Sequence, residues 1–246
     1  MRIIIPTYNE AENIVELLSR IDKSLSSIEN LDYKVFVIDD NSPDGTAEIA
    51  RNYGEEHGTV KVFVRERKEG LGSAILYGIR KALEDPTVTH IMTMDADLSH
   101  RPEDMPEMIK ETSVADLVQG SRYIEGGKII GWGLHRHIIS KIANFLVRTI
   151  YKTGLREHTT NYRIYSRRSA ELVSRYSTMK SYEWVIEALL INIACGMKVV
   201  ESPIIFVNRK KGKSKLAIGD MYRWWKFIVS YRKRFKEVRE SCKEVA

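Results

Sequence analysis

The sequence predicts an α/β protein with a mostly parallel sheet and helices on both of its faces. Two observations support this prediction. In the first half of the chain, short runs rich in Ile, Val, Phe and Met alternate with stretches of helical periodicity, and most of the short runs end in a polar cluster. Strands that alternate with helices in this way are typical of parallel sheets covered on both sides.

The first half of the chain contains the clearest elements. Strands are predicted over residues 2–6, 34–39, 61–65, 90–94 and 116–120. In the first connection, apolar side chains between residues 14 and 28 recur every three or four positions, and Asn9 is a suitable N-cap with Glu12 at the third position. The next helices are expected over residues 48–53, capped by Asp44, over residues 72–83, and from Pro102 onward.

The second half of the chain is less regular. It predicts a helix over residues 137–151, a strand over 162–166, a buried helix over 184–193 and a strand over 199–207. After these elements, aromatic residues mixed with Lys and Arg between residues 218 and 235 indicate an amphipathic helix. We therefore expect a globular domain of residues 1–216, followed by a basic amphipathic C-terminal helix within residues 217–246.

The positive charge of the chain is concentrated at its C-terminal end. The whole sequence carries 39 Lys and Arg against 33 Asp and Glu, a net charge of +6. From Arg209 onward there are 13 basic and 4 acidic residues, a net charge of +9, which leaves residues 1–208 at −3. A basic segment of this kind indicates an anionic partner, such as a phosphate, a nucleic acid or an acidic membrane surface.

The composition also bears on whether the chain spans a membrane and on whether its cysteines form a disulfide. No stretch approaches the roughly 18 apolar residues that a membrane-spanning helix needs. The two cysteines, Cys195 and Cys242, lie far apart and match neither a disulfide framework nor a zinc spacing. We expect them to be reduced thiols in a cytosolic setting.

Two acidic clusters follow predicted strands. Asp39 and Asp40 end the second strand, and Asp95-Ala96-Asp97 ends the fourth. Ligands of open parallel sheets bind outside the carboxyl ends of the strands. Two carboxylates one residue apart can hold a hard divalent cation that also binds substrate phosphates, although an isolated Asp-x-Asp can equally be a solvated loop.

Two common nucleotide-binding motifs are absent from the sequence. There is no Gly-x-x-x-x-Gly-Lys-Ser/Thr, which argues against a P-loop enzyme. The Gly70-Leu71-Gly72 segment lacks the third glycine of a dinucleotide fingerprint, and the first strand is followed by a turn that begins with Pro6. A dinucleotide-dependent dehydrogenase is therefore not expected.

The order of several longer motifs resembles the inverting family-two glycosyltransferases, which have the Rossmann-like GT-A fold. The matching segments are IIPTYNE at residues 4–10, IDDNSPDGT at 38–46 and MDADL at 94–98. Further matches resemble the branch of this family that makes dolichyl-phosphate mannose: GSRY at 120–123, the glycine pair at 126–127, Trp132, Arg136, Ser140, and the segments 209–212 and 214–216. The resemblance extends over residues 4–216 and implies a form without transmembrane helices.

The resemblance also implies roles for individual residues. Contacts to the nucleotide sugar are expected from Pro6, Tyr8, Glu10, Ile38, Asp40, Asp95, Ala96, Asp97, Arg209 and Lys215. The acceptor phosphate would bind Arg122, Arg136 and Ser140. Asp95 and Asp97 would bind Mg²⁺ or Mn²⁺, with Ser99 at a position where the family usually has the longer Gln. Asp97, Arg122 and Arg209 are the residues expected to be catalytic.

The reaction implied by the resemblance is transfer of mannose from GDP-mannose to dolichyl or another polyprenyl phosphate, with inversion. The second pKa of a phosphate monoester is about 6. The acceptor is therefore largely dianionic at neutral pH and attacks without a general base. The guanidinium fork of Arg binds phosphate in bidentate fashion, which suits the predicted acceptor site.

The sequence is also compatible with other functions. The donor could be UDP-glucose or another nucleotide sugar, because the core motifs are shared. A nucleotide-diphosphate-binding regulator is a further alternative, as is a basic RNA-binding module. The last would spread basic and stacking aromatic residues over one face, whereas here the charge lies in the tail, so no nucleic acid partner is expected.

The lipid acceptor requires contact with a membrane. We expect a peripheral enzyme at the cytoplasmic face, because tryptophan and tyrosine beside Lys and Arg are typical of an interfacial helix. The segment over residues 219–235 would bind the anionic membrane surface, or a small membrane-anchoring partner would hold the protein there.

Overall fold

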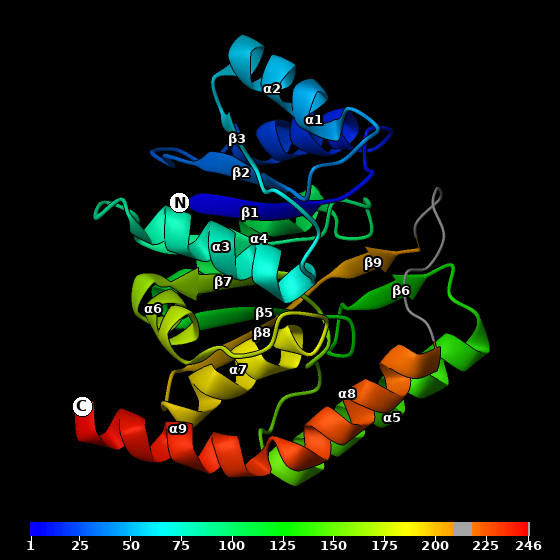
Figure 1. The fold of residues 1–246 in the computed structure, drawn as a ribbon, viewed down its shortest axis with the longest axis vertical. Coiled ribbons are helices and arrows are strands. Elements are labelled where there is room, and N and C mark those ends of the chain that lie inside the picture. The colour runs from blue at the N-terminus through cyan, green and yellow to red at the C-terminus, as the bar shows by residue number, and fades with distance from the viewer. Residues whose placement is uncertain (209–217, 246) are drawn as a thin grey trace.

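The computed structural model describes residues 1–208 and 218–245, and its central feature is a twisted sheet between two layers of helices (Figure 1). The order of the strands is β3 (Val60–Val64), β2 (Lys34–Asp39), β1 (Arg2–Thr7), β4 (His90–Thr93), β7 (Arg163–Ser166), β5 (Leu117–Ser121) and β8 (Val199–Pro203). Neighbouring strands are parallel except at β7, which is antiparallel to both β4 and β5. The predicted α/β class and mostly parallel sheet are confirmed.

Strand β1 shows why the sheet needs cover on both faces. Its residues Ile3, Ile4 and Ile5 are completely buried, and successive side chains of a strand point to opposite faces. Ile3 and Ile5 join one hydrophobic cluster, whereas Ile4 joins the other.

The two clusters define the helical layers. The first contains the apolar residues of α1 (Ile14–Leu25), α2 (Thr46–His57) and α4 (Met105–Lys110). The second contains those of α3 (Leu71–Leu83), α6 (Arg167–Tyr176) and α7 (Trp184–Ala194). Burial of its apolar side against the sheet therefore stabilises each of these helices.

Some predicted boundaries are wrong for identifiable reasons. Helix α1 begins at Ile14, with Asn13 in the N-cap position, because Asn9 has a left-handed backbone with φ of 59° and lies in the preceding turn. The 3₁₀ turn at Pro102–Asp104 leads into α4, as the proline position predicted.

The strand predicted over residues 199–207 is two strands. β8 ends at Pro203, and β9 (Ile205–Val207) pairs in parallel with β6 (Lys128–Ile130) in a small separate sheet. Helix α5 (Leu134–Tyr151) follows β6 and begins three residues earlier than predicted.

The C-terminal segment forms two helices instead of the single predicted one, α8 (Ile218–Ser230) and α9 (Arg232–Val245). Phe227, Ile228 and Tyr231 are buried in a cluster with residues of α5 and α7. Val238 of α9 is buried in a further cluster with residues of α6 and α7. The two helices are therefore packed on the preceding domain.

The prediction of two reduced thiols is wrong. Cys195 at the end of α7 and Cys242 in α9 form a disulfide, with their Cα atoms 5.2 Å apart. Their separation of 47 residues gave no indication of proximity, because α9 packs along α7 and so brings its last turns to the end of that helix. Within the described ranges, no helix combines the length and the apolar character needed to cross a bilayer.

Candidate active site

The carboxyl ends of β1 and β2 are joined by a buried carboxylate. Asp39 is completely buried and accepts hydrogen bonds from the Thr7 hydroxyl at 2.8 Å and from the Ser42 hydroxyl at 2.6 Å. Its neighbour Asp40 accepts a hydrogen bond from Nε of Arg65 at 2.6 Å. Asp39 is therefore held by the turn, and Asp40, which is also buried, is held by Arg65.

Other predicted nucleotide residues lie at the same sheet edge. Pro6 is in β1, and the ring of Tyr8 lies 4.2 Å from the Lys68 ammonium. The carboxylate of Glu10 accepts a hydrogen bond from Asn13 at 2.8 Å, next to the start of α1. Ile38 is also at this edge, but its side chain is completely buried in the core. Any contact from Ile38 to a ligand would therefore come from its backbone.

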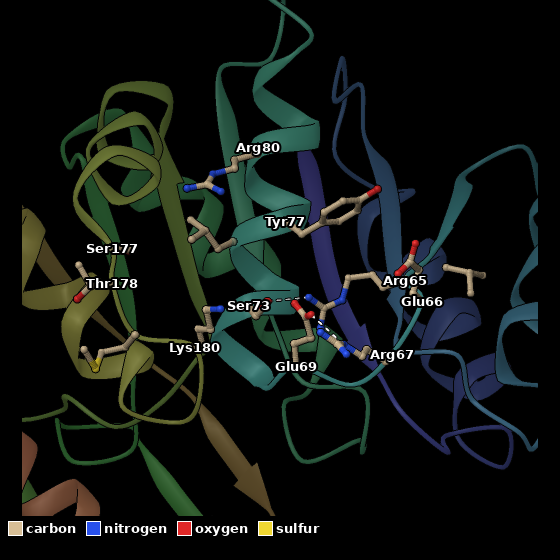
Figure 2. Close-up of a pocket in the computed structure, with 13 residues that line it drawn as sticks. Arg65, Glu66, Arg67, Glu69, Ser73, Tyr77, Arg80, Ser177, Thr178 and Lys180 are labelled. Atoms are coloured by element: carbon tan, nitrogen blue, oxygen red, sulfur yellow. Dashed lines mark hydrogen bonds and ion pairs between the residues drawn. The ribbon is translucent and has the colours of Figure 1, made fainter.

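A cavity of about 610 Å³ lies beside Arg65, the residue that pairs with Asp40 (Figure 2). It is lined by residues of α3, of the loop after β3 and of the segment 177–180, including Arg65, Ser73, Arg80 and Lys180. None of the predicted metal or acceptor residues lines it. This cavity is therefore separate from the predicted metal and acceptor residues.

The Asp95-Ala96-Asp97 segment follows β4, as predicted. Asp95 and Asp97 are partly exposed, whereas Ala96 between them is buried. Oδ1 of Asp95 accepts a hydrogen bond from the Asn161 amide at 3.2 Å, and Oδ1 of Asp97 accepts one from the backbone N–H of Ser99 at 3.1 Å. Both carboxylates are thus held by the protein while remaining accessible to a ligand.

His100 supports this turn from behind. Its side chain is buried, and burial lowers the pKa of its imidazole. Nδ1 accepts a hydrogen bond from the backbone N–H of Asp95 at 3.1 Å, and the ring stacks on Tyr162 with centroids 4.9 Å apart. His100 thereby fixes the start of the acidic turn.

The acidic turn suits a divalent cation whose remaining ligands come from the substrate and from water. Among the residues that the structure describes, no group of three or more His, Cys, Asp or Glu side chains could hold a metal ion. Mg²⁺ is commonly bound by one or two carboxylates together with substrate phosphates and waters. Asp95 and Asp97 provide such a pair, whereas Ser99 is almost fully buried.

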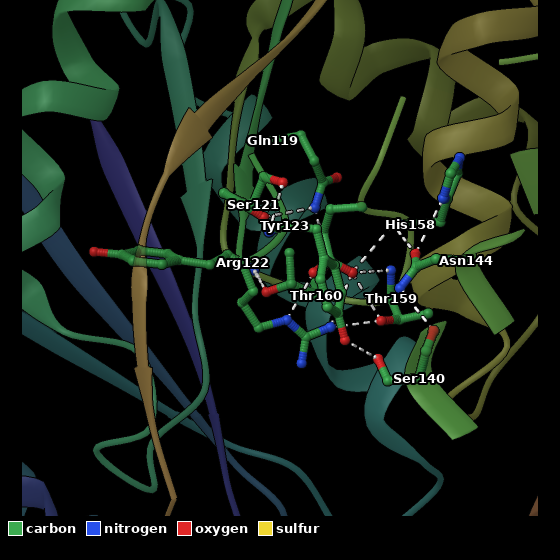
Figure 3. A network of polar contacts seen from close by, with 12 residues as sticks. Gln119, Ser121, Arg122, Tyr123, Ser140, Asn144, His158, Thr159 and Thr160 are labelled. Atoms are coloured by element: carbon green, nitrogen blue, oxygen red, sulfur yellow. Dashed lines mark hydrogen bonds and ion pairs between the residues drawn. The ribbon is translucent and has the colours of Figure 1, made fainter. Parts of the chain in front are cut away.

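The predicted acceptor residue Arg122 lies directly after β5 and is buried (Figure 3). Its Nε and Nη2 atoms donate to the two carboxylate oxygens of Glu157 at 2.6 and 2.9 Å, and Nη2 also donates to the Thr159 hydroxyl at 2.7 Å. Burial opposes ionisation of Glu157, but the charge and hydrogen bonds of Arg122 hold the pKa of that carboxyl well below its ordinary value. The pair is therefore an oriented buried ion pair.

Arg136 and Ser140 are close to Arg122 through shared aromatic neighbours. The Trp132 ring centroid lies 5.1 Å from the Arg122 guanidinium carbon and 4.3 Å from that of Arg136. The Tyr123 hydroxyl, adjacent in sequence to Arg122, donates to the Ser140 hydroxyl at 2.7 Å. Nε1 of Trp132 is buried and has no hydrogen-bond partner among the residues described. Nη1 of Arg136 donates to the side-chain oxygen of Asn208 at 2.8 Å, and Arg122 is paired with Glu157. Guanidinium groups of this kind can also bind phosphate.

Some residues of this site had no signal in the sequence. Glu157 was not predicted because a single glutamate in a loop belongs to no motif, and its contact with Arg122 spans 35 residues. Asn161 likewise belongs to none of the motifs, and its contact with Asp95 spans 66 residues. Arg209 and Lys215 lie outside the described residues, so their predicted roles remain predictions.

A buried histidine beside the ion pair predicts pH-dependent stability. Burial lowers the pKa of His158 from 6.5 to about 4, and its ring contacts Asn144 and Thr153. Between these pH values the unfolded chain binds a proton that the native protein excludes. The free energy of unfolding should therefore be highest above pH 6.5 and should fall as the pH decreases toward 4, by roughly 3 kcal/mol at about 1.4 kcal/mol per pKa unit.

Urea unfolding across this range checks the expectation. His158→Gln should flatten the decline, whereas His135→Gln, at an exposed position of α5, should leave it unchanged. Parallel curves for wild type and His158→Gln would show that His158 does not contribute.

The fold is that of a GT-A glycosyltransferase. The family described as "Glycosyl transferase family 2" matches residues 2–173, and the chain belongs to this family. An undecaprenyl-phosphate mannosyltransferase from Micrococcus luteus is 36% identical over 219 residues, covering 88% of this chain and 87% of the relative. A dolichol-phosphate mannosyltransferase from Pyrococcus furiosus is 36% identical over 232 residues, covering 94% of this chain but only 63% of the relative.

Solved structures support the fold. Glucosyl-3-phosphoglycerate synthase from Mycobacterium tuberculosis, solved with Mn²⁺, UDP and glucosyl-3-phosphoglycerate, aligns with a TM-score of 0.67 at 14% identity, covering 96% of this chain and 79% of that one. Mannosyl-3-phosphoglycerate synthase from Rubrobacter xylanophilus aligns with a TM-score of 0.65 at 16% identity, covering 95% and 73%. The resemblance to polyprenyl-phosphate mannosyltransferases and the GT-A fold expected from the sequence are both confirmed.

Proposed function

We propose that this protein transfers mannose from GDP-mannose to dolichyl or another polyprenyl phosphate, with inversion at the anomeric carbon. The observation that carries the proposal is that Arg122 and Arg136 both lie against the ring of Trp132, while Tyr123, next to Arg122, is hydrogen-bonded to Ser140. The names of the two relatives above support both the sugar and the acceptor class.

The sheet topology is consistent with a reaction between two substrates. The acidic turn follows β4 and Arg122 follows β5, and only β7 separates these strands. Since neighbouring strands are about 4.8 Å apart, the ends of β4 and β5 are separated by roughly 10 Å. That spacing can accommodate a donor diphosphate at one strand end and an acceptor phosphate at the other.

The residues would divide the chemistry as follows. Asp95 and Asp97 would hold Mg²⁺ or Mn²⁺, which would supply positive charge for the leaving diphosphate. Asp40 would accept hydrogen bonds from the base, with Tyr8 and Glu10 beside it. Arg122 and Arg136 would bind and orient the acceptor phosphate. Its oxygen would attack the anomeric carbon from the face opposite to the diphosphate, which gives inversion without a general base.

Arg209 and Lys215 lie outside the described residues. Arg209 and Lys215 would bind the donor phosphates within a catalytic domain of residues 1–216. The enzyme would act as a peripheral protein at the cytoplasmic face of a membrane, either alone or with a small membrane-anchoring partner.

A radiolabel transfer assay tests the function. Incubation with Mg²⁺, labelled GDP-mannose and a polyprenyl phosphate in detergent should give a labelled lipid, and labelled UDP-glucose in parallel should give little. Preferential transfer from UDP-glucose would replace the donor assignment and keep the acceptor. No transfer from any nucleotide sugar, despite tight binding of a nucleoside diphosphate, would favour a regulatory nucleotide-binding protein.

A further inference from the structure

The cavity beside Arg65 is a groove along one side of α3, and we call it the α3 groove (Figure 2). Its floor consists of helix residues that recur at intervals of three or four positions and so share one side of the helix: Ser73, Leu76, Tyr77 and Arg80. The loop after β3 and the segment 177–180 form walls on either side of α3. None of the described residues predicted to bind the nucleotide sugar, the metal or the acceptor lines this groove.

The wall formed by the segment 177–180 is held in place by a buried carboxylate. Glu187 of α7 is completely buried and accepts hydrogen bonds from the backbone N–H of Met179 at 2.8 Å and from the Thr178 hydroxyl at 2.6 Å. The carbonyl oxygen of Lys180 accepts a hydrogen bond from the backbone N–H of Ser73 at 2.9 Å. This wall is therefore fixed to both α7 and α3.

The α3 groove is positively charged. Its charged lining residues are four basic and two acidic side chains, a net charge of +2: Arg65, Arg67, Arg80, Lys180, Glu66 and Glu69. Arg67 pairs with Glu69 at 3.3 Å. Arg80 and Lys180 are exposed, and neither belongs to an ion pair within the described part of the chain. Unpaired Arg and Lys side chains of this kind suit phosphate groups.

Arg65 has an unused hydrogen-bond donor. Its side chain is only 9% exposed, its Nε donates to Asp40 at 2.6 Å, and its Nη1 donates to the Ser73 hydroxyl at 2.8 Å. Nη2 is buried and has no hydrogen-bond partner among the residues that the structure describes. Buried donors are nearly always bonded to the protein or to an ordered molecule. Because Figure 2 shows this guanidinium pointing toward α3, an oxygen atom bound in the groove would satisfy the donor.

The cations lie toward the two ends of the α3 groove. Arg65 and the backbone of Lys180 both contact Ser73 at the start of α3, whereas Arg80 is seven residues further along the helix. At a rise of 1.5 Å per residue, seven residues correspond to about 10 Å. Leu76 and Tyr77 line the groove between these ends. The volume of about 610 Å³ is within the range of small-molecule sites.

We propose that the α3 groove binds a small organic molecule that carries two phosphate groups. One phosphate would bind Arg65 and Lys180, the other would bind Arg80, and the organic part would lie against Leu76 and Tyr77. This site is separate from both substrates of the proposed reaction.

Arg65 also connects the α3 groove to the donor side, because the same guanidinium holds Asp40. A phosphate bound to Nη2 would use a donor that neither Asp40 nor Ser73 occupies. It should therefore hold Arg65 and Asp40 more firmly, so that the bound molecule increases the affinity for GDP. This link, unlike the phosphate site itself, rests on the proposed function.

Calorimetry with fructose 1,6-bisphosphate as the probe tests the site, in EDTA and without nucleotide or lipid. Wild type should bind this probe at least about tenfold more tightly than fructose 6-phosphate, because the second phosphate adds charge-assisted hydrogen bonds. Arg80→Gln/Lys180→Gln should abolish that preference. The matched control Lys81→Gln/Arg168→Gln removes the same two charges from α3 and α6 outside the groove and should retain it.

Two further measurements complete the test. Arg136→Gln, which alters the proposed acceptor site, should bind the probe like wild type. Saturating fructose 1,6-bisphosphate should raise the affinity of wild type for GDP at least about twofold, but not that of Arg80→Gln/Lys180→Gln. Because the probe is measured alone, its binding supports the site even if no sugar transfer is found.

Four outcomes would overturn parts or all of the proposal. Equal affinity of wild type and Arg80→Gln/Lys180→Gln for the probe would exclude the α3 groove as its site. Binding that is lost only in Arg136→Gln would place the phosphates at the acceptor site instead. Tripolyphosphate that binds as tightly as the probe would exclude the organic part of the ligand. An unchanged affinity for GDP would exclude the link through Arg65.

Discussion

Asp97→Asn should reduce mannosyl transfer by at least about a hundredfold, a loss comparable to removal of one electrostatic contact to a developing negative charge. The substitution keeps the size of the side chain and an oxygen that can accept the Ser99 hydrogen bond. It removes the negative charge that would hold a divalent cation beside the leaving diphosphate. Initial rates at increasing Mg²⁺ or Mn²⁺ measure the loss of transfer and of metal binding. The thermal unfolding temperature shows whether the fold is unchanged.

A matched control separates the site from general charge effects. Glu107→Gln removes a carboxylate that pairs with Lys110 in α4, with both side chains largely exposed, and should leave transfer unchanged. Dialysis against excess EDTA should abolish wild-type transfer, and added Mg²⁺ or Mn²⁺ should restore it. Full wild-type activity in EDTA would exclude the metal assignment.

Substitution of Arg122 should have the second large effect, and it should act on both activity and stability. Arg122→Ala leaves the carboxylate of Glu157 buried without its partner, which typically costs about 3–5 kcal/mol of unfolding free energy. It also removes a guanidinium proposed to bind the acceptor phosphate. We expect kcat/KM for the lipid phosphate to fall by about 10²–10³, while affinity for GDP in calorimetry changes little.

Three variants distinguish the two effects. Arg122→Met/Glu157→Leu replaces the pair with apolar residues and should recover much of the stability but none of the transfer. Arg122→Lys keeps the charge but loses the bidentate contact with Glu157 and should be intermediate in both. Arg136→Ala should weaken use of the acceptor with a smaller loss of stability, because Arg136 is only half-buried. An equal loss of GDP affinity in these variants would contradict the acceptor assignment.

The sequence was sufficient for elements whose signal is local. The apolar runs of β1 and β2 predicted their boundaries within one residue, and the acidic pairs that begin at Asp39 and Asp95 lie at the carboxyl ends of β2 and β4, as predicted. Local patterns could not give the direction of β7, because an apolar strand reads the same in either orientation. The same limitation applies to Cys195 and Cys242, which become neighbours only through the packing of α9 on α7.

Side-chain contacts within the site were least predictable. Arg122 and Arg136 were identified from the motif, but the sequence did not reveal that Arg122 is buried and held by Glu157. Likewise, the apolar and basic residues of the C-terminal segment indicated one amphipathic helix, whereas the segment forms two, α8 and α9. Which of its residues face the domain depended on the position of α5 and α7, and this position is a property of the whole fold.

The reversed direction of β7 has a consequence for how the two halves of the site are coupled. A parallel strand between β4 and β5 would bring its last residues to the site, whereas β7 brings its first residue, Arg163, opposite Thr93 and Gln119. The segment just before β7 therefore crosses the whole width of the site. Glu157 at its start holds Arg122, and Asn161 near its end contacts Asp95. One short stretch of backbone thus connects the proposed donor and acceptor positions, so a change in its length would displace both together.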